Sequence, residues 1–335
     1  MQLTILVLND IHLDLNFDND NRACKNKSTQ FKQFGVVNCD TTVPLYEQLQ
    51  SQINRQFPCI YLGDSPAHGQ NTNFDLIKKV MTDVNCSGYA LGNNDAETNY
   101  KFDNKRINQF MQMDNNFQED GLYINYNFYD GIVYIGLNTV NLQKIDQYDQ
   151  LGRLEAVLKN ATQFKQQVVI GCHIPFGAGH FKGDFIDSKI RQNYKQILAK
   201  YENQIILEVN GHYHTEWWRW IGNIPSFINP GISPSNQNFP GYREYKLEKV
   251  ENKWHLVDYH QYYADLTKEE VQFEIQYKFS QLYPLLQDQK YITGEVLKQL
   301  SAMQYFDKQF LSWRTIQRNM LEAYDINQII KNMKD

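Results

Sequence analysis

Five short apolar runs of this chain end in polar side chains that can bind a metal ion, and four of these ends also hold a glycine. The runs cover residues 3–8, 58–62, 89–91, 167–170 and 205–209. Short runs dominated by apolar residues are typical of buried strands. Ligand sites in open α/β sheets lie at the carboxyl ends of the strands. The pattern therefore predicts one site assembled from five strand ends.

The side chains at these ends are oxygen and imidazole donors. In chain order they are Asp10, His12, Asp64, Asn93, His173, His212 and His214. Each donor alone is explained equally well as a hydrogen-bonded loop residue, but five such motifs in series are not. Mixed oxygen and imidazole donors without a Cys ligand suit zinc, iron or manganese. The set predicts two divalent ions, most simply zinc, roughly 3.5–4 Å apart, with Asp64 shared between them.

Several further segments carry a more specific pattern. They are 63–68 (GDSPAH), 35–40 (GVVNCD) with Cys24 before it, 171–177 (GCHIPFG), 229–235 (NPGISPS), 240–243 (PGYR) and 262–267 (YYADLT). Together with the donors, they resemble the acid sphingomyelinase-like phosphodiesterases, a family of the calcineurin-like metallophosphoesterase superfamily. The donors alone indicate only the superfamily, whereas the GDSPAH and PGYR segments indicate the family.

The resemblance implies a role for each matched residue. Asp10, His12, Asp64 and His214 would hold one ion, and Asp64, Asn93, His173 and His212 would hold the other. His68 would lie beside the phosphate as a hydrogen-bond donor or as the acid that protonates the leaving group. Tyr242 would touch the substrate. Independently of the resemblance, His180 follows a glycine-rich stretch and would reach the active site from a flexible loop.

Asn94 departs from the family pattern, which has a histidine at that position. Asparagine cannot act as a general acid. Either His68 supplies the proton, or the substrate has a good leaving group, or activity is lost. The motif Gly92-Asn93-Asn94-Asp95 also resembles the vacuolar endopolyphosphatases, whose leaving group needs little protonation.

The implied activity is hydrolysis of phosphodiester or phosphoanhydride bonds by a metal-bound hydroxide that attacks phosphorus. Sphingomyelin-type phospholipids and nucleotides are the implied substrates. Two alternatives stay open because of Asn94: an endopolyphosphatase, and a catalytically weak metal-binding pseudoenzyme that acts as a partner protein.

The order of the predicted elements indicates an α/β fold. Helical patterns cover residues 45–57, 74–84, 149–161 and 190–198, and hairpins are predicted at 123–137 and after 217–221. The resemblance implies a four-layer sandwich of two mixed sheets flanked by helices over residues 1–258. Residues 259–335 are predicted to form a small helical C-terminal subdomain, with helices at 271–286, 293–303 and 310–323.

Composition limits the partners of the chain. Its 335 residues include 33 basic and 38 acidic side chains mixed along the sequence, for a net charge of −5, so no basic patch indicates a nucleic-acid scaffold. No run approaches the roughly 18 apolar residues of a membrane span. A monomer that acts on a small molecule or a phospholipid is expected. True acid sphingomyelinases place a saposin-like domain ahead of this part of the chain, so either that domain has been removed or this protein is expected to work without it, as nucleotide-active relatives do.

The five cysteines bear on the compartment. The resemblance supports a Cys24–Cys39 bridge, Cys59 and Cys86 are candidates for a second bridge, and Cys172 is expected to be a buried free thiol. Disulfides would imply a secreted, lysosomal or vacuole-like protein whose leader has been removed. Sequons begin at Asn26, Asn85 and Asn160, close to the number expected by chance, so glycosylation is allowed rather than indicated.

The segment Trp217-Trp218-Arg219-Trp220 follows closely after the last histidine motif. It has two interpretations: an aromatic rim that holds a lipid or nucleobase, or a strand with alternating faces. The strand is favoured because aromatic residues have high strand propensity. His255 and His260 are interpreted as structural.

Overall fold

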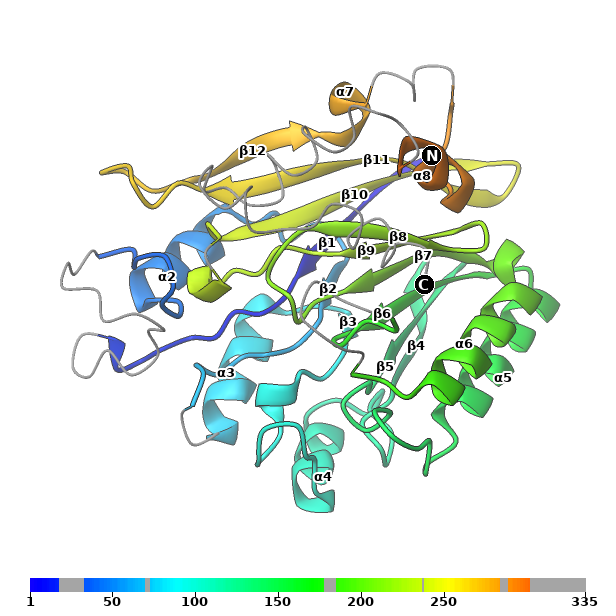
Figure 1. Cartoon of the computed structure of the whole chain (residues 1–335), viewed down its shortest axis with the longest axis horizontal. Coiled ribbons are helices and arrows are strands. Elements are labelled where there is room, and N and C mark those ends of the chain that lie inside the picture. The colour runs from blue at the N-terminus through cyan, green and yellow to red at the C-terminus, as the bar shows by residue number, and fades with distance from the viewer. Residues whose placement is uncertain (18–32, 70–72, 178–184, 237, 284–288, 302–335) are drawn as a thin grey trace.

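Two six-stranded sheets face each other, and helices cover their outer sides (Figure 1). The computed structural model describes residues 1–17, 33–69, 73–177, 185–236, 238–283 and 289–301. Both sheets contain parallel and antiparallel pairs. The predicted sandwich of two mixed sheets flanked by helices is therefore confirmed.

The first sheet has the strand order β12-β11-β10-β1-β2-β3. Its strands are β1 (Gln2–Leu8), β2 (Cys59–Tyr61), β3 (Gly88–Tyr89), β10 (Gly241–Val250), β11 (Lys253–Ala264) and β12 (Phe273–Lys278). The strands β1, β2 and β3 are parallel, whereas β10, β11 and β12 add antiparallel partners on the other side of β1. The segments that follow the three parallel strands consequently emerge at the same edge.

The second sheet has the strand order β4-β5-β6-β7-β9-β8. Its strands are β4 (Tyr123–Tyr129), β5 (Ile132–Leu137), β6 (Gln167–Cys172), β7 (Ile205–Asn210), β8 (Trp217–Ile221) and β9 (Ile224–Ile228). Both predicted hairpins are present as the antiparallel pairs β4–β5 and β8–β9. The strands β5, β6, β7 and β9 are parallel, which brings the segments after β6 and β7 to one edge.

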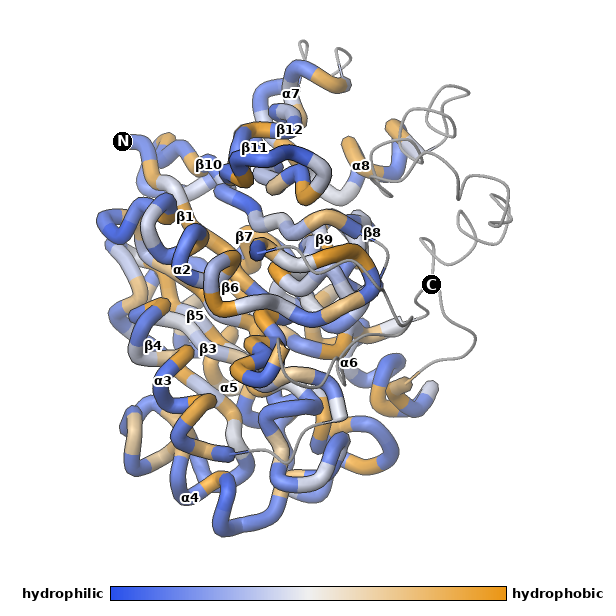
Figure 2. The backbone as a smooth tube through the Cα atoms, turned by 90° about the vertical axis from the view of Figure 1, so that its left-hand side faces the viewer, coloured by the Kyte–Doolittle hydropathy of each residue, from blue (hydrophilic) through white to orange (hydrophobic). Residues whose placement is uncertain are grey.

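Alternating side chains divide the core into two layers. In β5, Ile132 and Tyr134 pack in the cluster between the sheets, whereas Val133 and Ile135 pack in a second cluster beneath α5 (Gln150–Gln163) and α6 (Ser188–Lys200). Successive side chains of a strand point to opposite faces, so each strand of this sheet supplies both layers. The sheet is therefore buried on both sides, and the hydropathy-coloured trace has its apolar segments mainly in the interior (Figure 2).

The four helices predicted before residue 200 are present, three of them with shifted ends. The helix predicted at 74–84 is observed as α3 (Phe74–Val84), and those predicted at 149–161 and 190–198 are observed as α5 and α6. The helix predicted at 45–57 is α2 (Val43–Gln52), which begins earlier because Thr42 caps it by accepting a hydrogen bond from the Leu45 amide. One helix, α4 (Asn104–Met113), was not predicted.

The helix predicted at 271–286 is wrong. Residues Phe273–Lys278 form β12, which pairs antiparallel with β11, and only the short helix α7 (Phe279–Leu282) follows. Phe273 and Tyr277 are buried, and pairing with a neighbouring strand outweighs a helix-like spacing when aromatic residues dominate. Of the other C-terminal helices, α8 (Gly294–Ser301) matches the second prediction, and 310–323 lies outside the described residues.

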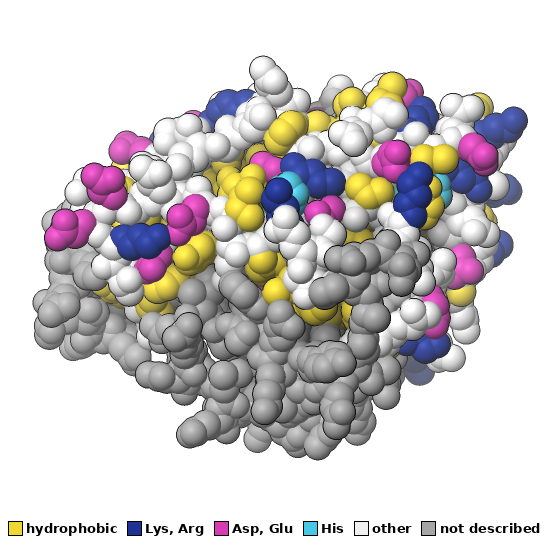
Figure 3. Space-filling view, turned by 90° about the horizontal axis from the view of Figure 1, so that it is seen from above, with side chains coloured by type: hydrophobic (Ala, Val, Ile, Leu, Met, Phe, Trp, Pro, Cys, Tyr) yellow, Lys and Arg dark blue, Asp and Glu magenta, His cyan; other side chains and the backbone are white. Residues whose placement is uncertain are grey.

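The boundary predicted between residues 258 and 259 falls inside β11, so the first sheet extends into the predicted C-terminal part. The division into two domains stays a prediction. Within the described part of the chain, no helix is both long enough and apolar enough to span a membrane. The face on the side of β10, β11 and β12 shows acidic and basic side chains interspersed (Figure 3).

The tryptophan segment forms the strand β8, and its first two rings are buried. Trp217 and Trp218 are each 1% exposed. The Trp218 ring packs edge-on against Phe279 and Tyr283, at centroid distances of 5.5 and 5.2 Å. The strand interpretation is confirmed, and the aromatic rim is wrong because these rings fill the core.

The cysteines behave as predicted where the structure describes them. Cys59 and Cys86 form a disulfide with Cα atoms 4.4 Å apart. It joins β2 to the segment before β3, and these two strands lead to two of the predicted metal-binding motifs. Cys172 is a buried free thiol. The predicted Cys24–Cys39 bridge cannot be followed because Cys24 lies outside the described residues.

Candidate metal centre

The seven predicted ligands converge where the parallel strands of the two sheets end. Asp10 and His12 follow β1, Asp64 follows β2, and Asn93 lies in a 3₁₀ turn (Asn93–Asp95) after β3. His173 follows β6, and His212 and His214 follow β7. Three groups of donors are close enough to hold an ion: Asp10-His12-Asp64, Asp64-His173-His212 and His12-His68-His214. The fold thus assembles a single centre from five strand ends.

Asp64 lies between two sets of donors. Its Oδ2 is 3.4 Å from His12 Nε2 and 3.3 Å from His173 Nε2. On one side, His214 Nε2 lies 3.2 Å from His12 Nε2 and 3.3 Å from Asp10 Oδ1. This arrangement gives the side of His12 and His214 two imidazoles and two carboxylates.

The opposite side of Asp64 holds the remaining donors. His173 Nε2 is 3.0 Å from Asn93 Oδ1 and 3.3 Å from His212 Nδ1. The Asn93 amide nitrogen donates to Asn99 Oδ1 at 2.7 Å, and this bond fixes the amide with its oxygen toward His173. The second set therefore contains two imidazoles, an amide oxygen and the shared carboxylate.

Three of the histidines are oriented with one ring nitrogen bound outside the centre. His12 Nδ1 is 2.9 Å from the Pro66 carbonyl oxygen, and His173 Nδ1 is 2.8 Å from the Leu62 carbonyl oxygen. His214 Nδ1 is 3.1 Å from Ser235 Oγ. In the neutral ring, an Nδ1–H that donates to a carbonyl leaves the lone pair on Nε2, which is how proteins prepare histidines for metals. These three Nε2 atoms face the carboxylates.

His212 uses the opposite ring nitrogen. Its Nδ1 faces His173, and its Nε2 lies 3.5 Å from the Tyr100 hydroxyl. The backbone amide of His212 donates to Asp10 Oδ2 at 2.9 Å. Asp10 Oδ1 is buried and accepts no hydrogen bond among the described residues. A buried carboxylate oxygen without a donor is costly unless a cation occupies the space beside it.

The electrostatics of the centre favour positive charge. Burial disfavours the imidazolium of His12, but the carboxylates of Asp10 and Asp64 outweigh it and raise its pKa to about 9. Burial also disfavours the imidazolium of His173, but the Asp64 carboxylate outweighs it and raises the pKa of His173 to about 9. Burial and the neighbouring His173 lower the pKa of His212 to about 3. Without an ion, protons on His12 and His173 balance the buried carboxylates, and a divalent cation would displace them. The donor set, the orphaned Asp10 oxygen and the charge therefore fit a metal centre.

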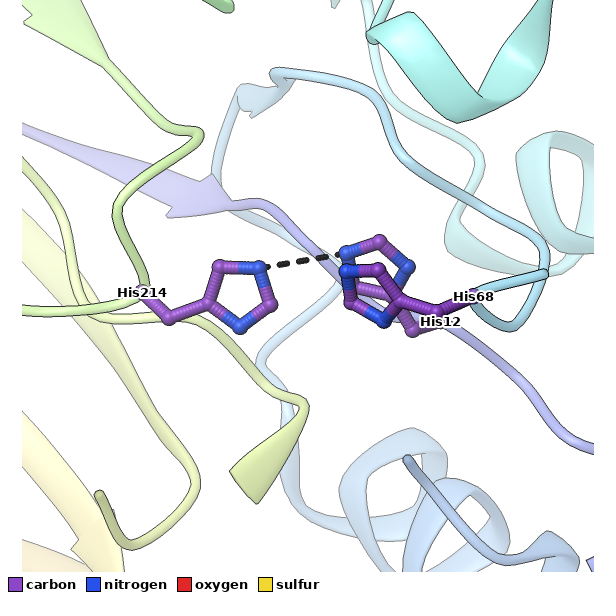
Figure 4. Close-up of side chains that lie close together, drawn as sticks. All are labelled: His12, His68 and His214. Atoms are coloured by element: carbon purple, nitrogen blue, oxygen red, sulfur yellow. Dashed lines mark hydrogen bonds between the residues drawn. The ribbon is translucent and has the colours of Figure 1, made fainter. Parts of the chain in front are cut away.

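His68 lies beside this centre without belonging to a strand end. Its ring stacks on His12 with centroids 3.8 Å apart, and the His214 ring lies 5.8 Å away (Figure 4). Its side chain is 37% exposed, whereas those of His12 and His214 are buried. His68 is therefore the histidine of this group that a substrate can reach.

Asn94 is buried, and both of its amide groups bind Asp64. Its side-chain amide donates to Asp64 Oδ2 and its backbone amide donates to Asp64 Oδ1, both at 2.7 Å. The family that the sequence resembles has a histidine at this position, whereas this chain has an asparagine that binds the Asp64 carboxylate.

Comparison with known proteins gives modest but consistent similarities. No protein-family model matches the chain. It is 26% identical over 199 residues to cyclic GMP-AMP phosphodiesterase SMPDL3A of Bos taurus, a match covering 54% of this chain and 43% of that protein. It is 25% identical over 162 residues to sphingomyelin phosphodiesterase 1 of Caenorhabditis elegans, a match covering 42% of this chain and 27% of that protein. The resemblance to the acid sphingomyelinase-like phosphodiesterases is confirmed. The chain matches less than half the length of either relative.

Two solved structures were compared with the fold of this chain. A dimetal phosphatase from Danio rerio has a TM-score of 0.48 at 11% identity, over 77% of this chain and 95% of that chain. Purple acid phosphatase PPD1 from yellow lupin has a TM-score of 0.48 at 12% identity, over 82% of this chain and 53% of that chain.

Two predicted substrate contacts remain predictions. Tyr242 is 3% exposed, and its ring stacks on Tyr262 at a centroid distance of 4.6 Å. His180 lies outside the described residues. His255 stacks on Tyr291 at 4.1 Å, and His260 lies 3.8 Å from Asp258, so both lie apart from the centre.

Three residues that support the centre were missed by sequence reasoning. Asp95 accepts hydrogen bonds from the backbone amides of Asp64, Ser65 and Gly92 at 2.8–2.9 Å. Asn99 orients Asn93, and Asp40 binds His68. Asp95 ends the motif 92–95 and Asp40 ends the segment 35–40, so the sequence motifs contained a signal for these two residues. No sequence motif contained Asn99.

The backbone of five predicted ligands adopts the left-handed conformation, with φ of 50° at Asp10, 44° at His12, 62° at Asp64, 72° at His212 and 59° at His214. Residues other than glycine rarely adopt this backbone conformation, and such backbone strain concentrates at functional sites. The sheets and their loops must impose it.

This strain predicts different preferences at two histidines. In metal-free protein, His212→Gly is expected to be more stable than His212→Ala by about 1 kcal/mol, because glycine has no Cβ to strain at positive φ. His173 does not share the positive φ, so His173→Gly is expected to be less stable than His173→Ala by roughly 0.5–1 kcal/mol. Urea denaturation in the presence of a chelator measures all four variants. The same order of stability of the Gly and Ala variants at both positions would contradict the left-handed backbone assigned to His212.

Proposed function

We propose that this chain is a two-metal phosphodiesterase. The observation that carries the proposal is the position of the Asp64 carboxylate, whose Oδ2 lies 3.3–3.4 Å from imidazole nitrogens on both sides. A carboxylate so placed can be shared by two ions. Asp10, His12 and His214 would complete one site, and Asn93, His173 and His212 the other. Zinc is the ion we expect, because imidazole and carboxylate donors without thiolate suit it, with iron or manganese as alternatives.

Two ions in this centre would activate a water molecule as the nucleophile and stabilise negative charge on the phosphoryl oxygens. The protein's own contribution is orientation. The carbonyls of Pro66 and Leu62 hold the rings of His12 and His173, and Asn94 holds Asp64. Rigid placement of this kind reduces the reorganisation needed during the reaction.

His68 is the residue we assign to the leaving group. It is the partly exposed member of the group His12-His68-His214, and the Asn94 amide cannot act as a general acid. As the oxygen of water bonds to phosphorus, the bond to the leaving oxygen breaks. That oxygen keeps the electron pair of the broken bond and takes the Nε2 proton of His68 in its imidazolium form. The water loses a proton to solvent, and His68 regains one.

A phosphodiester is the substrate class we propose. The names of the two relatives describe phosphodiesterases of a cyclic dinucleotide and of sphingomyelin. Nucleotide and sphingomyelin-type substrates are therefore the first to assay. The Cys59–Cys86 disulfide agrees with a secreted, lysosomal or vacuolar compartment.

Metal removal tests the proposal. The purified chain is expected to contain about two ions and to hydrolyse bis(p-nitrophenyl) phosphate, because the seven donors form two sets. Dialysis against a chelator should abolish hydrolysis, and added zinc, manganese or iron should restore it. Elemental analysis and absorbance of released p-nitrophenol measure both quantities. Full activity after the ions have been removed would overturn the proposal.

Cyclic GMP-AMP, sphingomyelin and polyphosphate then serve as parallel substrates. Hydrolysis of either diester supports a phosphodiesterase, whereas shortening of polyphosphate alone would favour an endopolyphosphatase.

A further inference from the structure

One buried carboxylate holds both the backbone and the ring of His68. Asp40 Oδ2 accepts a hydrogen bond from the His68 backbone amide at 2.7 Å, and Asp40 Oδ1 lies 2.8 Å from His68 Nδ1. The Asp40 side chain is fully buried. Two bonds from one residue to one carboxylate fix the loop and the ring orientation together.

This contact determines which ring nitrogen of His68 can serve a substrate. An ionised carboxylate only accepts hydrogen bonds, so His68 Nδ1 must donate. Nε2 is then the nitrogen left for another partner. The ring is also held by stacking on His12, with 18° between the two planes. Aspartate bound to the far nitrogen of a histidine selects its tautomer in the same way in hydrolytic triads.

A third donor connects Asp40 with the metal centre. Ser233 Oγ donates to Asp40 Oδ1 at 2.9 Å. The backbone of the same serine donates to the Asp10 carbonyl at 2.9 Å, and its carbonyl oxygen lies 3.4 Å from His214 Nδ1. Asp40 is thereby positioned by the segment that also supports two of the proposed metal ligands, and movements of His68 relative to the centre are restricted.

Burying a carboxylate is costly unless donors compensate for the lost water. The donors observed here are two groups of His68 and the Ser233 hydroxyl, and Asp40 has no cationic Lys or Arg among its ion-pair partners in the described part of the chain. Its interactions are thus concentrated on the one histidine that a substrate can reach.

We propose that Asp40 is a positioning residue that holds His68 with Nε2 directed to the leaving-group oxygen of a phosphodiester. The role of His68 toward the leaving group rests on the proposed function, whereas the orientation of His68 by Asp40 does not. Asp40 acts through His68, which is the group that touches the substrate.

Two readouts test the proposal on the zinc-loaded full chain. The first is the nitrogen NMR spectrum of histidine-labelled protein, in which His68 is identified by the signal lost in His68→Gln. When neutral, His68 is expected to be the Nδ1–H tautomer in the wild type, so that Nε2 is the nitrogen that gains and gives the second proton, and to lose that preference in Asp40→Ala. Asp40→Asn, which keeps the volume, serves if the alanine variant fails to fold. An unchanged His68 tautomer in both variants would overturn the proposal.

The second readout compares two leaving groups. A dinucleoside phosphate releases an alkoxide that needs a proton, whereas bis(p-nitrophenyl) phosphate releases a phenolate that needs little. Asp40→Asn is expected to lower kcat/KM for the first substrate by roughly 100-fold or more, within the range of general acid catalysis, and to change the second much less. The double variant with His68→Ala should be no slower than His68→Ala alone.

The control is Asp83→Asn, since Asp83 also bonds to several side chains but lies on the surface beside Lys79. It should alter neither readout. An equal loss on both substrates, or a loss of zinc in Asp40→Asn, would overturn the positioning role in favour of a structural one. A wild type that binds two ions yet cleaves neither substrate would defeat the proposed function, and the NMR result would still decide the orientation.

Discussion

Replacing Asp64 by asparagine is expected to abolish hydrolysis of bis(p-nitrophenyl) phosphate and to lower the metal content of both sites. The carboxylate lies between the donors His12 and His173, so its charge supports both ions. Removing a group that merely bonds to a metal ligand costs roughly 10–100-fold in affinity or activity, and a shared ligand should cost more. Steady-state kinetics and elemental analysis of the purified variant measure the two effects.

The matched control is Asp130→Asn. Asp130 is an exposed aspartate in the turn between β4 and β5, where it pairs with Lys249. A surface ion pair contributes about 0–1 kcal/mol, so this variant should keep its metal and its activity. If Asp64→Asn retained two ions and wild-type kcat, the two-metal centre would be wrong.

Gly92→Ala is expected to displace Asp64 although it adds a single methyl group. A Cβ on Gly92 would lie 2.1 Å from Asp64 Oδ1 and 2.3 Å from the Asp64 backbone nitrogen. The two loops must then separate, and Asp95, which accepts from the amides of both residues, cannot follow both. A displacement of about 1 Å can cost 100-fold in rate. We expect a loss of that order in kcat/KM together with weaker metal binding.

Gly131→Ala separates this effect from general destabilisation. Gly131 has φ of +70°, so alanine is strained there by about 1 kcal/mol or more, but its nearest neighbour would be Lys249 Nζ at 4.0 Å. Both variants should unfold at lower urea concentrations than the wild type, and only Gly92→Ala should lose activity. Similar kinetics for the two variants would show that the approach of Gly92 to Asp64 is not needed.

Local sequence patterns predicted most of the architecture because they report which residues are buried. The mainly apolar runs of β1, β6 and β7 mark strands covered on both faces, and the hairpins β4–β5 and β8–β9 have glycine-containing turns. The pattern failed at β12, where pairing with β11 decides the conformation of Phe273 and Tyr277. Neighbouring strands are not visible in a local pattern.

By itself the sequence determined the identity and order of the donors, because polar residues that directly follow apolar runs must emerge at strand ends. Only the tertiary structure decided how those donors are held. The Asn94 amide on Asp64 and the Asp40 carboxylate on His68 are contacts between loops, and the left-handed backbone at His212 is a conformation that the surrounding fold imposes. Asp40 and Ser233 are 193 residues apart, and the tertiary fold brings them together beside the metal centre. Such contacts depend on how the loops pack in three dimensions, and no local pattern contains that information.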